Sequence, residues 1–450
     1  MEPFRFHLFV CTQQKPEGVP SCPASGSFAV LDALDRETQA RGLSHEVQLT
    51  TCGCMGLCDE GPVMVAYPTG VWYRRVRPSD VGEILEAHLD GGKPVERLVW
   101  NDAPAMKAMS VEHGEKFRAA MAARDKAGML PDRFEQMIRG FMSSRCLLTA
   151  LELDIFTAVG EGANAEEIGT RVHANARAVS MLLNALVALG LLSKSGDDYR
   201  NTPESARFFV QGSNDNHRNG LLHTANIWHR WSTLTDAVRM GTRVPMDRDR
   251  SPEWTRNFIA GMQRNAKDRA PLVVQALGTA GLHRILDLGG GSGAYSIAFA
   301  RAVPTLCADI LDLAEVVPIA QKHIHEAGLD GRINTRVGDM LSAPLGENYD
   351  LILVMAICHM FSPEENRALF QRARKALAPH GRFVIQDFIL EPDKTAPRQA
   401  TLFALNMLVG TRAGATYSEP EYTTWLHAAN FTQVRRVRLP GPSSLLIASV

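Results

Sequence analysis

A glycine-rich turn, D-L-G-G-G-S-G at residues 287–293, is the first stretch whose residue types and spacing could do chemistry. Strand-forming residues precede it and apolar residues at helical spacing follow, which predicts a strand, a tight turn and a helix. Glycine permits positive φ and lets a bulky ligand lie against bare backbone. Asp312 comes about 20 residues after the turn, the usual place for a carboxylate that binds a ribose diol. Dinucleotide dehydrogenases use a related turn, so this stretch predicts a nucleoside-binding site without choosing its ligand.

Cysteines form the second chemical group. Five of the eight cysteines lie in the first 58 residues: Cys11, Cys22, Cys52, Cys54 and Cys58. In a reducing compartment such clustering favours metal ligation over disulfide bonds. The pairs Cys11-x₁₀-Cys22 and Cys54-x₃-Cys58 supply four thiolates, which suit a [2Fe–2S] cluster or a tetrahedral zinc ion. A module that has lost its metal is the third interpretation.

Residues with acid, base or soft sulfur side chains follow three later apolar runs. In a chain that alternates strands and helices, ligands bind at the carboxyl ends of the strands. These residues are therefore candidates for one site with the glycine turn, although an aspartate after a strand is also a frequent helix cap. They are Asp339 with Met340, His359 and Asp387, which follow the runs 334–337, 351–355 and 383–386.

The elements that must position these residues fall into four segments. Residues 1–98 predict a small α/β domain, and residues 99–131 a charged linker with one helix. Residues 132–280 are helical with a small hairpin, and residues 281–450 alternate strands with helices, as right-handed βαβ units do. The expected strands are 6–10, 45–49, 63–67, 71–74, 285–286, 306–310, 334–337, 351–355, 383–386 and a pair within 433–448. The expected helices are 25–41, 81–88, 106–127, 163–172 and 178–192.

The composition excludes several classes of protein. A chain of 450 residues is too long for one core, so two or three domains are expected. A formal net charge of −1 leaves no basic excess for a nucleic-acid or membrane surface. No apolar run approaches the roughly 20 residues that span a bilayer. Residues 4–10 make a poor export signal because Arg5 and His7 interrupt them, so the cytoplasm is the expected compartment.

Residues 134–450 resemble the class I S-adenosylmethionine (SAM)-dependent methyltransferases, and among them the caffeic acid and acetylserotonin O-methyltransferase group. The resemblance implies a Rossmann-like methyltransferase domain over 281–450 and a winged-helix domain over 132–280. In that group the winged-helix domain forms a homodimer and helps to bind a small-molecule methyl acceptor. Winged helices also read nucleic acid, but here Arg171, Arg177, Lys194 and Arg200 are interspersed with acidic residues, which argues against that role. The motifs that carry the resemblance are D-L-G-G-G-S-G (287–293), D-L-A-E-V-V (312–317), G-D-M (338–340) and I-C-H-M-F-S (357–362).

The same resemblance implies roles for single residues. Asp312 would bind the ribose, while Asp339 and Met340 would bind the amino group and the face of the adenine. His359 would be the general base, and Asp387 one of two acids that flank it. The implied SAM-binding residues are Gly289, Gly291, Gly293, Asp312, Leu313, Asp339 and Met340. The implied acceptor pocket contains Trp228, Phe258, Met262, Met355 and Met407, whose soft apolar side chains suggest a flat or large hydrophobic acceptor.

The sequence departs from the family pattern around the histidine. Met360 replaces the usual aspartate, Phe361 a tryptophan, and Met355 a polar or basic residue. The second flanking acid would fall near Thr416, where no carboxylate stands. These changes leave the SAM site intact and weaken the acid–base machinery. The ordered set of motifs makes O-methylation the leading hypothesis. The weakened base leaves C- or S-methylation, or a redox enzyme that keeps the fold, as alternatives.

Residues 1–98 resemble the thioredoxin-like [2Fe–2S] ferredoxins, whose second ligand loop reads C-x-G-x-C before a polar residue and G-P. The chain has C-M-G-L-C-D-E-G-P at 54–62. The resemblance implies that Cys11, Cys22, Cys54 and Cys58 bind the cluster and that Cys52 is spare. The cluster could deliver electrons to a substrate or a partner protein, regulate the transferase, or support the fold.

Overall fold

The computed structural model describes residues 4–15, 19–246 and 252–450, without the side chains of residues 132, 219, 252–257, 260, 264 and 265. The chain divides into two compact units, Met1–Phe141 and Met142–Val450. This division is coarser than the four expected segments. The expected linker, 99–131, belongs to the first unit, and the helical segment shares the second unit with the carboxyl-terminal sheet. The finer boundaries stay predictions.

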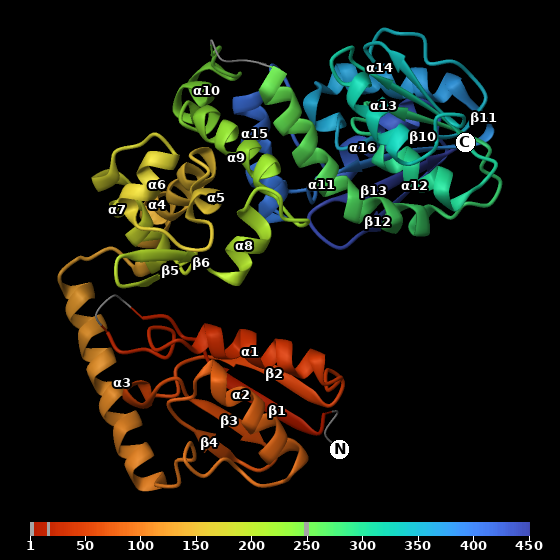
Figure 1. The fold of residues 1–450 in the computed structure, drawn as a ribbon. Helices are drawn as coiled ribbons and strands as arrows, with labels where there is room; N and C mark the ends of the chain where they lie inside the picture. The colour runs from red at the N-terminus through yellow and green to blue at the C-terminus, as the bar shows by residue number, and fades with distance from the viewer. Residues whose placement is uncertain (1–3, 16–18, 247–251) are drawn as a thin grey trace. The chain divides into compact units, whose positions relative to one another are not determined.

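The first unit is built on a four-stranded sheet (Figure 1). Its elements are β1 (Phe6–Cys11), α1 (Ser27–Ala40), β2 (Val47–Cys52), η1 (Cys58–Glu60), β3 (Met64–Tyr67), β4 (Val71–Tyr73), η2 (Pro78–Asp80), α2 (Val81–Ile84), η3 (Leu85–Asp90) and α3 (Ala103–Lys126). The strand order is β2-β1-β3-β4, with β1 parallel to β2 and antiparallel to β3, and β3 antiparallel to β4. The parallel step from β1 to β2 needs a crossover, and α1 supplies it. Alternate residues of β1, such as Leu8 and Val10, are buried with Val30 and Leu34 of α1.

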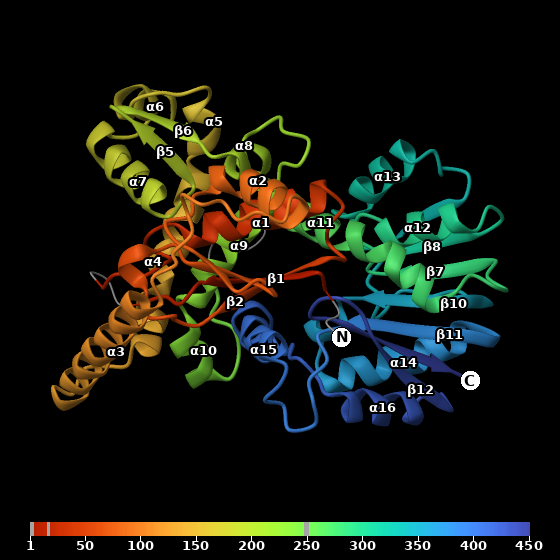
Figure 2. The ribbon, with the colours of Figure 1, turned by 90° about the horizontal axis from the view of Figure 1, so that it is seen from below.

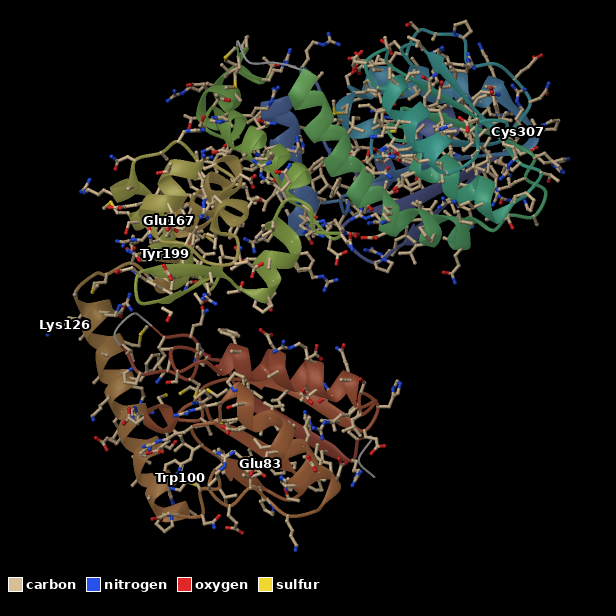
Figure 3. All side chains as sticks on the ribbon, viewed as in Figure 1. Glu83, Trp100, Lys126, Glu167, Tyr199 and Cys307 are labelled. Atoms are coloured by element: carbon tan, nitrogen blue, oxygen red, sulfur yellow. The ribbon has the colours of Figure 1, made fainter. Side chains whose placement is uncertain are left out.

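The second unit begins with a helical part that contains the expected hairpin. Its elements are α4 (Asp132–Glu152), which starts in the first unit, α5 (Ile155–Val159), α6 (Ala165–Arg171), α7 (Ala176–Ala188), β5 (Leu192–Ser195), β6 (Asp198–Asn201), α8 (Pro203–Phe209), α9 (Arg218–Trp231), α10 (Leu234–Met240) and α11 (Pro252–Leu277). Asn164 and Asn175 cap α6 and α7 by accepting hydrogen bonds from backbone N–H groups. Tyr199 of β6 is buried and donates its hydroxyl hydrogen bond to Asn184 at 2.8 Å, which ties the hairpin to α7 (Figure 3).

A seven-stranded sheet forms the rest of the second unit. Its elements are β7 (Arg284–Leu288), α12 (Ala294–Ala302), β8 (Cys307–Asp312), α13 (Val317–Glu326), β9 (Ile333–Val337), β10 (Tyr349–Met355), η4 (Cys358–Met360), α14 (Pro363–Ala376), β11 (Leu377–Asp387), α15 (Arg398–Gly410), α16 (Glu419–Ala428), β12 (Gln433–Arg438) and β13 (Ser444–Ser449). The strand order is β12-β13-β11-β10-β7-β8-β9, parallel from β11 to β9 and antiparallel at β13. The chain reverses its direction across the sheet between β7 and β10, which is where open α/β sheets bind ligands.

Helices cover both faces of this sheet. Leu286 and Val354 point into a core with α14 and α16, while Ile285 and Leu353 point into another with α11, α12 and α13. This alternation is the period of a strand, and burial of both faces explains the continuous apolar runs in the sequence. Figure 2 shows α12 and α13 apart from α14 and α16. None of the helices in the described ranges combines the length and apolar character needed to cross a bilayer.

Candidate active site and cysteine cluster

The glycine turn leaves the carboxyl end of β7 and begins α12. Gly289, Gly291 and Gly293 have φ values of 64°, 58° and 78°, so the predicted left-handed conformations are found. A Cβ on Gly289 would lie 2.6 Å from Cε of Met340 and 2.8 Å from Cδ1 of Ile357. The Met340 thioether therefore packs against the bare backbone of the turn, and a side chain at position 289 has no room.

Asp312 and Asp339 follow the neighbouring strands β8 and β9. Oδ2 of Asp312 accepts from the Gly291 N–H at 2.8 Å, and Oδ1 accepts from the Leu313 N–H at 2.7 Å. Burial raises the pKa of Asp312. Asp339 is exposed, and its Oδ1 accepts from the Leu341 N–H at 2.8 Å, as a capping residue does. The three strand ends thus gather the predicted SAM-binding residues at one edge of the sheet.

Asp287 is a site residue that the sequence analysis did not single out. It is fully buried at the start of the turn, and its Oδ2 accepts from the Ser296 hydroxyl at 2.8 Å. Its Oδ1 has no hydrogen-bond partner among the described residues. Burial raises the pKa of Asp287 to about 6, against the stabilising hydrogen bond from Ser296. A buried carboxylate with an unused acceptor beneath the turn suits a ligand that brings a donor or positive charge.

His359 and Asp387 follow the adjacent parallel strands β10 and β11. Nδ1 of His359 lies 2.6 Å from Oδ1 of Asp387, and the His359 backbone N–H donates to Oδ2 at 3.0 Å. Both side chains are buried. Because an ionised carboxylate only accepts, the contact places the ring proton on Nδ1 and leaves Nε2 as an acceptor. No described residue engages Nε2. The predicted pair is therefore brought together in a geometry suited to proton abstraction.

Two phenylalanines that the sequence analysis missed lie against this histidine. The Phe403 ring of α15 stands 4.8 Å from the His359 ring in an edge-to-face arrangement. Phe388, directly after β11, stacks on Phe403 at 4.1 Å. Phe388 follows Asp387 in sequence, so its position could have suggested a site residue, but no local pattern points to Phe403. Stacked aromatic rings beside a base favour a flat, apolar partner.

The comparisons with known proteins agree with this arrangement. Residues 231–432 match the O-methyltransferase domain, and residues 135–211 match the O-methyltransferase dimerisation domain. The chain is 33% identical to 3-hydroxy-5-methyl-1-naphthoate 3-O-methyltransferase of Streptomyces sahachiroi, over 70% of this chain and 93% of that relative. It is 31% identical to the tetracenomycin polyketide synthesis 8-O-methyltransferase of Streptomyces glaucescens, over 70% of this chain and 96% of that relative.

The chain belongs to the SAM-dependent O-methyltransferase family. A structural comparison gives the same result. The crystal structure of human N-acetylserotonin methyltransferase in complex with SAM matches with a TM-score of 0.63 at 25% identity, over 71% of this chain and 96% of that one. The expected methyltransferase fold and dimerisation domain are confirmed.

The predicted acceptor-pocket residues of this O-methyltransferase come from four elements. Trp228 lies on α9, Phe258 and Met262 on α11, Met355 at the end of β10, and Met407 on α15. Met355 and Met407 are buried. Trp231 on α9 donates its ring N–H to Asn406 of α15 at 3.0 Å, which holds these two helices together. A separate cavity of about 600 Å³ lies between α11, α12 and α13, and none of the predicted site residues lines it. The pocket assignment stays a prediction.

The cysteines of the first unit lie at the ends of β1 and β2 and in the segments that follow these two strands. Cys11 and Cys22 are close enough for their interaction to lower the pKa of Cys11 and raise that of Cys22, and the sulfur atoms of Cys54 and Cys58 are 3.5 Å apart. Cys54 is exposed and the other three are buried. Cys52 sits opposite Cys11 in the ladder of β1 and β2. Cys307, at the start of β8, is exposed and belongs to the second unit (Figure 3).

Two local features shape the surroundings of these sulfur atoms. Lys15 donates to Sγ of Cys58 at 2.9 Å. Burial raises the pKa of the Cys58 thiol, and the contact with Lys15 opposes that rise. A Cβ on Gly61 would lie 3.1 Å from Sγ of Cys22. The glycine before Pro62 therefore lets the backbone pass close to sulfur.

The helix α3 covers the second cysteine loop, a role that the sequence did not indicate. Ser110 donates to the Met55 carbonyl at 3.3 Å, and His113 contacts Asp59 at 2.9 Å. Gly56 has φ 77°, and a Cβ there would lie 2.4 Å from Oγ of Ser110. The segment expected to be a linker is thus part of the cysteine site.

Within the described ranges, no group of three or more His, Cys, Asp or Glu side chains surrounds a point where one metal ion could bind. The cysteines are arranged as two pairs. The ferredoxin assignment stays a prediction, because neither family match covers residues 1–98.

Proposed function

We propose that this O-methyltransferase methylates a phenolic hydroxyl of an aromatic, polyketide-like acceptor, with His359 as general base. The observation that carries the proposal is the 2.6 Å contact between Nδ1 of His359 and Oδ1 of Asp387. It fixes the tautomer in which Nε2 can take the phenol proton, and the carboxylate stabilises the imidazolium that forms. Bound SAM supplies the methyl group, so the acceptor O–CH₃ bond forms as the sulfonium S–CH₃ bond breaks.

The residues at the ends of β7, β8 and β9 fit SAM. The Gly289 backbone is bare, and Met340 packs beside it as a soft apolar surface for a ring. Asp312 is held at the sheet edge by two backbone N–H groups, ready to accept from a diol. The unpartnered Oδ1 of Asp287 is an acceptor beneath the turn. We assign SAM binding to Gly289, Gly291, Gly293, Asp312, Leu313, Asp339 and Met340, as the sequence predicted, and add Asp287.

The acceptor class is supported by the relatives and by the surroundings of the base. The two streptomycete relatives are named for a hydroxynaphthoate and for a polyketide. Phe388 and Phe403 give His359 stacked aromatic neighbours. Met355 is buried at the end of β10, and Met407 is buried on α15. We infer that the acceptor is a fused-ring phenol whose ring packs on these side chains.

The test uses the full chain, isotope-labelled SAM and 3-hydroxy-5-methyl-1-naphthoate as the acceptor probe. Label transfer with a mass gain of one methylene group, together with an ether in the product, supports O-methylation. A product methylated on carbon or sulfur would overturn O-methylation in favour of C- or S-methylation. Absence of SAM binding by calorimetry at millimolar concentration would remove the proposal altogether.

We also propose that Cys11, Cys22, Cys54 and Cys58 hold a [2Fe–2S] cluster in a thioredoxin-like ferredoxin module. The strand order β2-β1-β3-β4, with β3 antiparallel to its neighbours, supports that fold. Each iron of such a cluster takes two thiolates, and the cysteines stand as two close pairs. Zinc bound by the same four thiolates is the alternative.

The cluster is tested by iron and sulfide content and by visible absorbance of the anaerobically purified full chain. We expect Cys54→Ser to lose the absorbance and Cys52→Ser, the matched control, to keep it. A colourless protein with one zinc per chain would overturn the cluster. Methyl transfer by the oxidised and the reduced protein then separates a regulatory or redox role, which changes the rate, from a structural one, which does not.

We infer a homodimer that forms through α4. The dimerisation-domain match begins at residue 135, within this helix. Its first three turns expose large apolar side chains at helical spacing: Phe134, Met137, Ile138, Phe141 and Met142. A stripe of this kind would be buried in a stable protein, and a second copy is the partner to which the family match points.

A further inference from the structure

The Asp387 carboxylate accepts hydrogen bonds from three residues, His359, Phe388 and Tyr422. Oδ1 accepts from the His359 ring and from the Phe388 backbone N–H at 2.8 Å. Oδ2 accepts from the His359 backbone N–H and from the Tyr422 hydroxyl at 3.1 Å. Tyr422 lies on α16 and is fully buried. Its hydroxyl is therefore the contact through which α16 reaches the pair.

The second acid of the family pattern is absent from this pair. Thr416, which stands near that place, is buried and donates its hydroxyl hydrogen bond to the Ala400 carbonyl at 3.2 Å. Among the described side chains, those that bond to the Asp387 carboxylate are His359 and Tyr422. The pair therefore contains one carboxylate, and that carboxylate also accepts from a neutral hydroxyl.

We propose that Tyr422 is a positioning residue that holds Asp387 in register with His359 and sets the basicity of the imidazole. The proposal rests on the proposed function, in which His359 is the base. The hydroxyl shares the negative charge of Oδ2, so it weakens the pull of the carboxylate on the imidazolium. Removing the hydroxyl would concentrate charge on Asp387 and favour the protonated ring, which cannot act as a base.

The other titratable groups around the pair are few. Cys358, buried in η4, faces Asp387, and burial raises the pKa of its thiol. Tyr417 precedes α16 and lies near Asp387, Cys358, Glu421 and Glu364. The Tyr417 hydroxyl donates to the Phe361 carbonyl and not to the carboxylate. On α15, the residue packed on the histidine is Phe403, which carries no charge.

The experiment titrates His359 by NMR in the full chain labelled with ¹⁵N-histidine, with the signal assigned by its loss in His359→Asn. We compare the wild type, Tyr422→Phe and the control Tyr417→Phe, which also loses one buried hydroxyl. Tyr422→Phe is expected to raise the pKa of His359 by roughly half a unit, while Tyr417→Phe leaves it in place. With the naphthoate probe, kcat of Tyr422→Phe falls by up to about threefold, because a half-unit rise in the pKa of His359 lowers the unprotonated fraction by no more than that factor. KM for SAM stays unchanged, because Tyr422 lies outside the proposed SAM site.

A second variant keeps the proposal testable if Tyr422→Phe does not fold. Replacing Tyr422 with 3-fluorotyrosine preserves the packing and makes the hydroxyl a stronger donor, so the pKa of His359 should fall. An unchanged His359 pKa in Tyr422→Phe and in the fluorotyrosine protein would overturn the proposal. A different failure, full turnover by His359→Ala, would instead refute His359 as base and leave the titration result standing.

Discussion

Nδ1 of His359 lies 2.6 Å from Oδ1 of Asp387, although the two residues are 28 positions apart in the chain. The parallel pairing of β10 and β11 places both residues beyond the same edge of the sheet, four positions after one strand and at the end of the other. The geometry of the pair thus follows from the register of two strands, and it determines that Nε2 is the ring nitrogen left to accept a proton.

Replacing His359 with alanine should lower kcat for the naphthoate probe by about 10²- to 10⁴-fold, because proton abstraction by a positioned base is worth that much. The affinity for SAM should change little, since the proposed SAM-binding residues lie at the carboxyl ends of β7, β8 and β9. Steady-state turnover assays measure kcat, and calorimetry measures the affinity for SAM. His380→Ala is the control, because His380 is exposed near the start of the same strand as Asp387. Equal kcat in both variants would mean that the acceptor loses its proton without this histidine.

Replacing Gly289 with alanine should abolish measurable SAM binding. The new Cβ would meet Cε of Met340 at 2.6 Å and Cδ1 of Ile357 at 2.8 Å, and φ of 64° is unfavourable for alanine. Gly328→Ala is the matched control, because Gly328 has φ of 68° but nothing within 4 Å of an added Cβ. Calorimetry with SAM should distinguish the two variants. If they bind SAM equally well, the close packing of the turn does not shape the SAM site.

The sequence predicted the strands of the large sheet because both faces are buried and the runs are continuously apolar, as in Leu351–Met355. It also predicted the positive φ values of the glycine turn, since no other residue type fits there at low cost. Tyr422 and Phe403 could not be predicted. They reach the His359–Asp387 pair from α16 and α15, and those contacts depend on how the helices fold back over the sheet. The same holds for Ser110, which meets Gly56 through packing of two segments 54 positions apart.

Replacing Asp287 with asparagine should stabilise the SAM-free protein at neutral and alkaline pH. Burial raises the pKa of Asp287 from 3.8 to about 6, so folding favours the protonated carboxyl. The stability that the protonated Asp287 carboxyl contributes to the folded state is fully present below pH 3.8 and is lost as the pH rises through 6. Above that, the buried charge costs about 3 kcal/mol, which asparagine avoids.

Urea unfolding at pH 8 and pH 5 checks this sign. The gain in unfolding free energy from Asp287→Asn should be largest at pH 8 and about half as large at pH 5. The exposed Asp330→Asn is the control and should show little gain at either pH. A gain that grows toward pH 5 would contradict the burial of an ionisable carboxyl at position 287.

Introducing charge on the exposed stripe of α4 should dissociate the proposed homodimer. Met137 and Ile138 are 69% and 58% exposed in the single chain, so glutamate at both positions is tolerated by the monomer. In a dimer each copy would lose two buried apolar contacts, worth at least about 1.5 kcal/mol each. The dissociation constant should therefore rise by about three orders of magnitude or more, as measured by sedimentation velocity across a concentration series.

Gln136→Glu adds charge to the same helix on its other side and should leave the dimer intact. If the double variant sediments as the wild type does, the two copies associate through another surface.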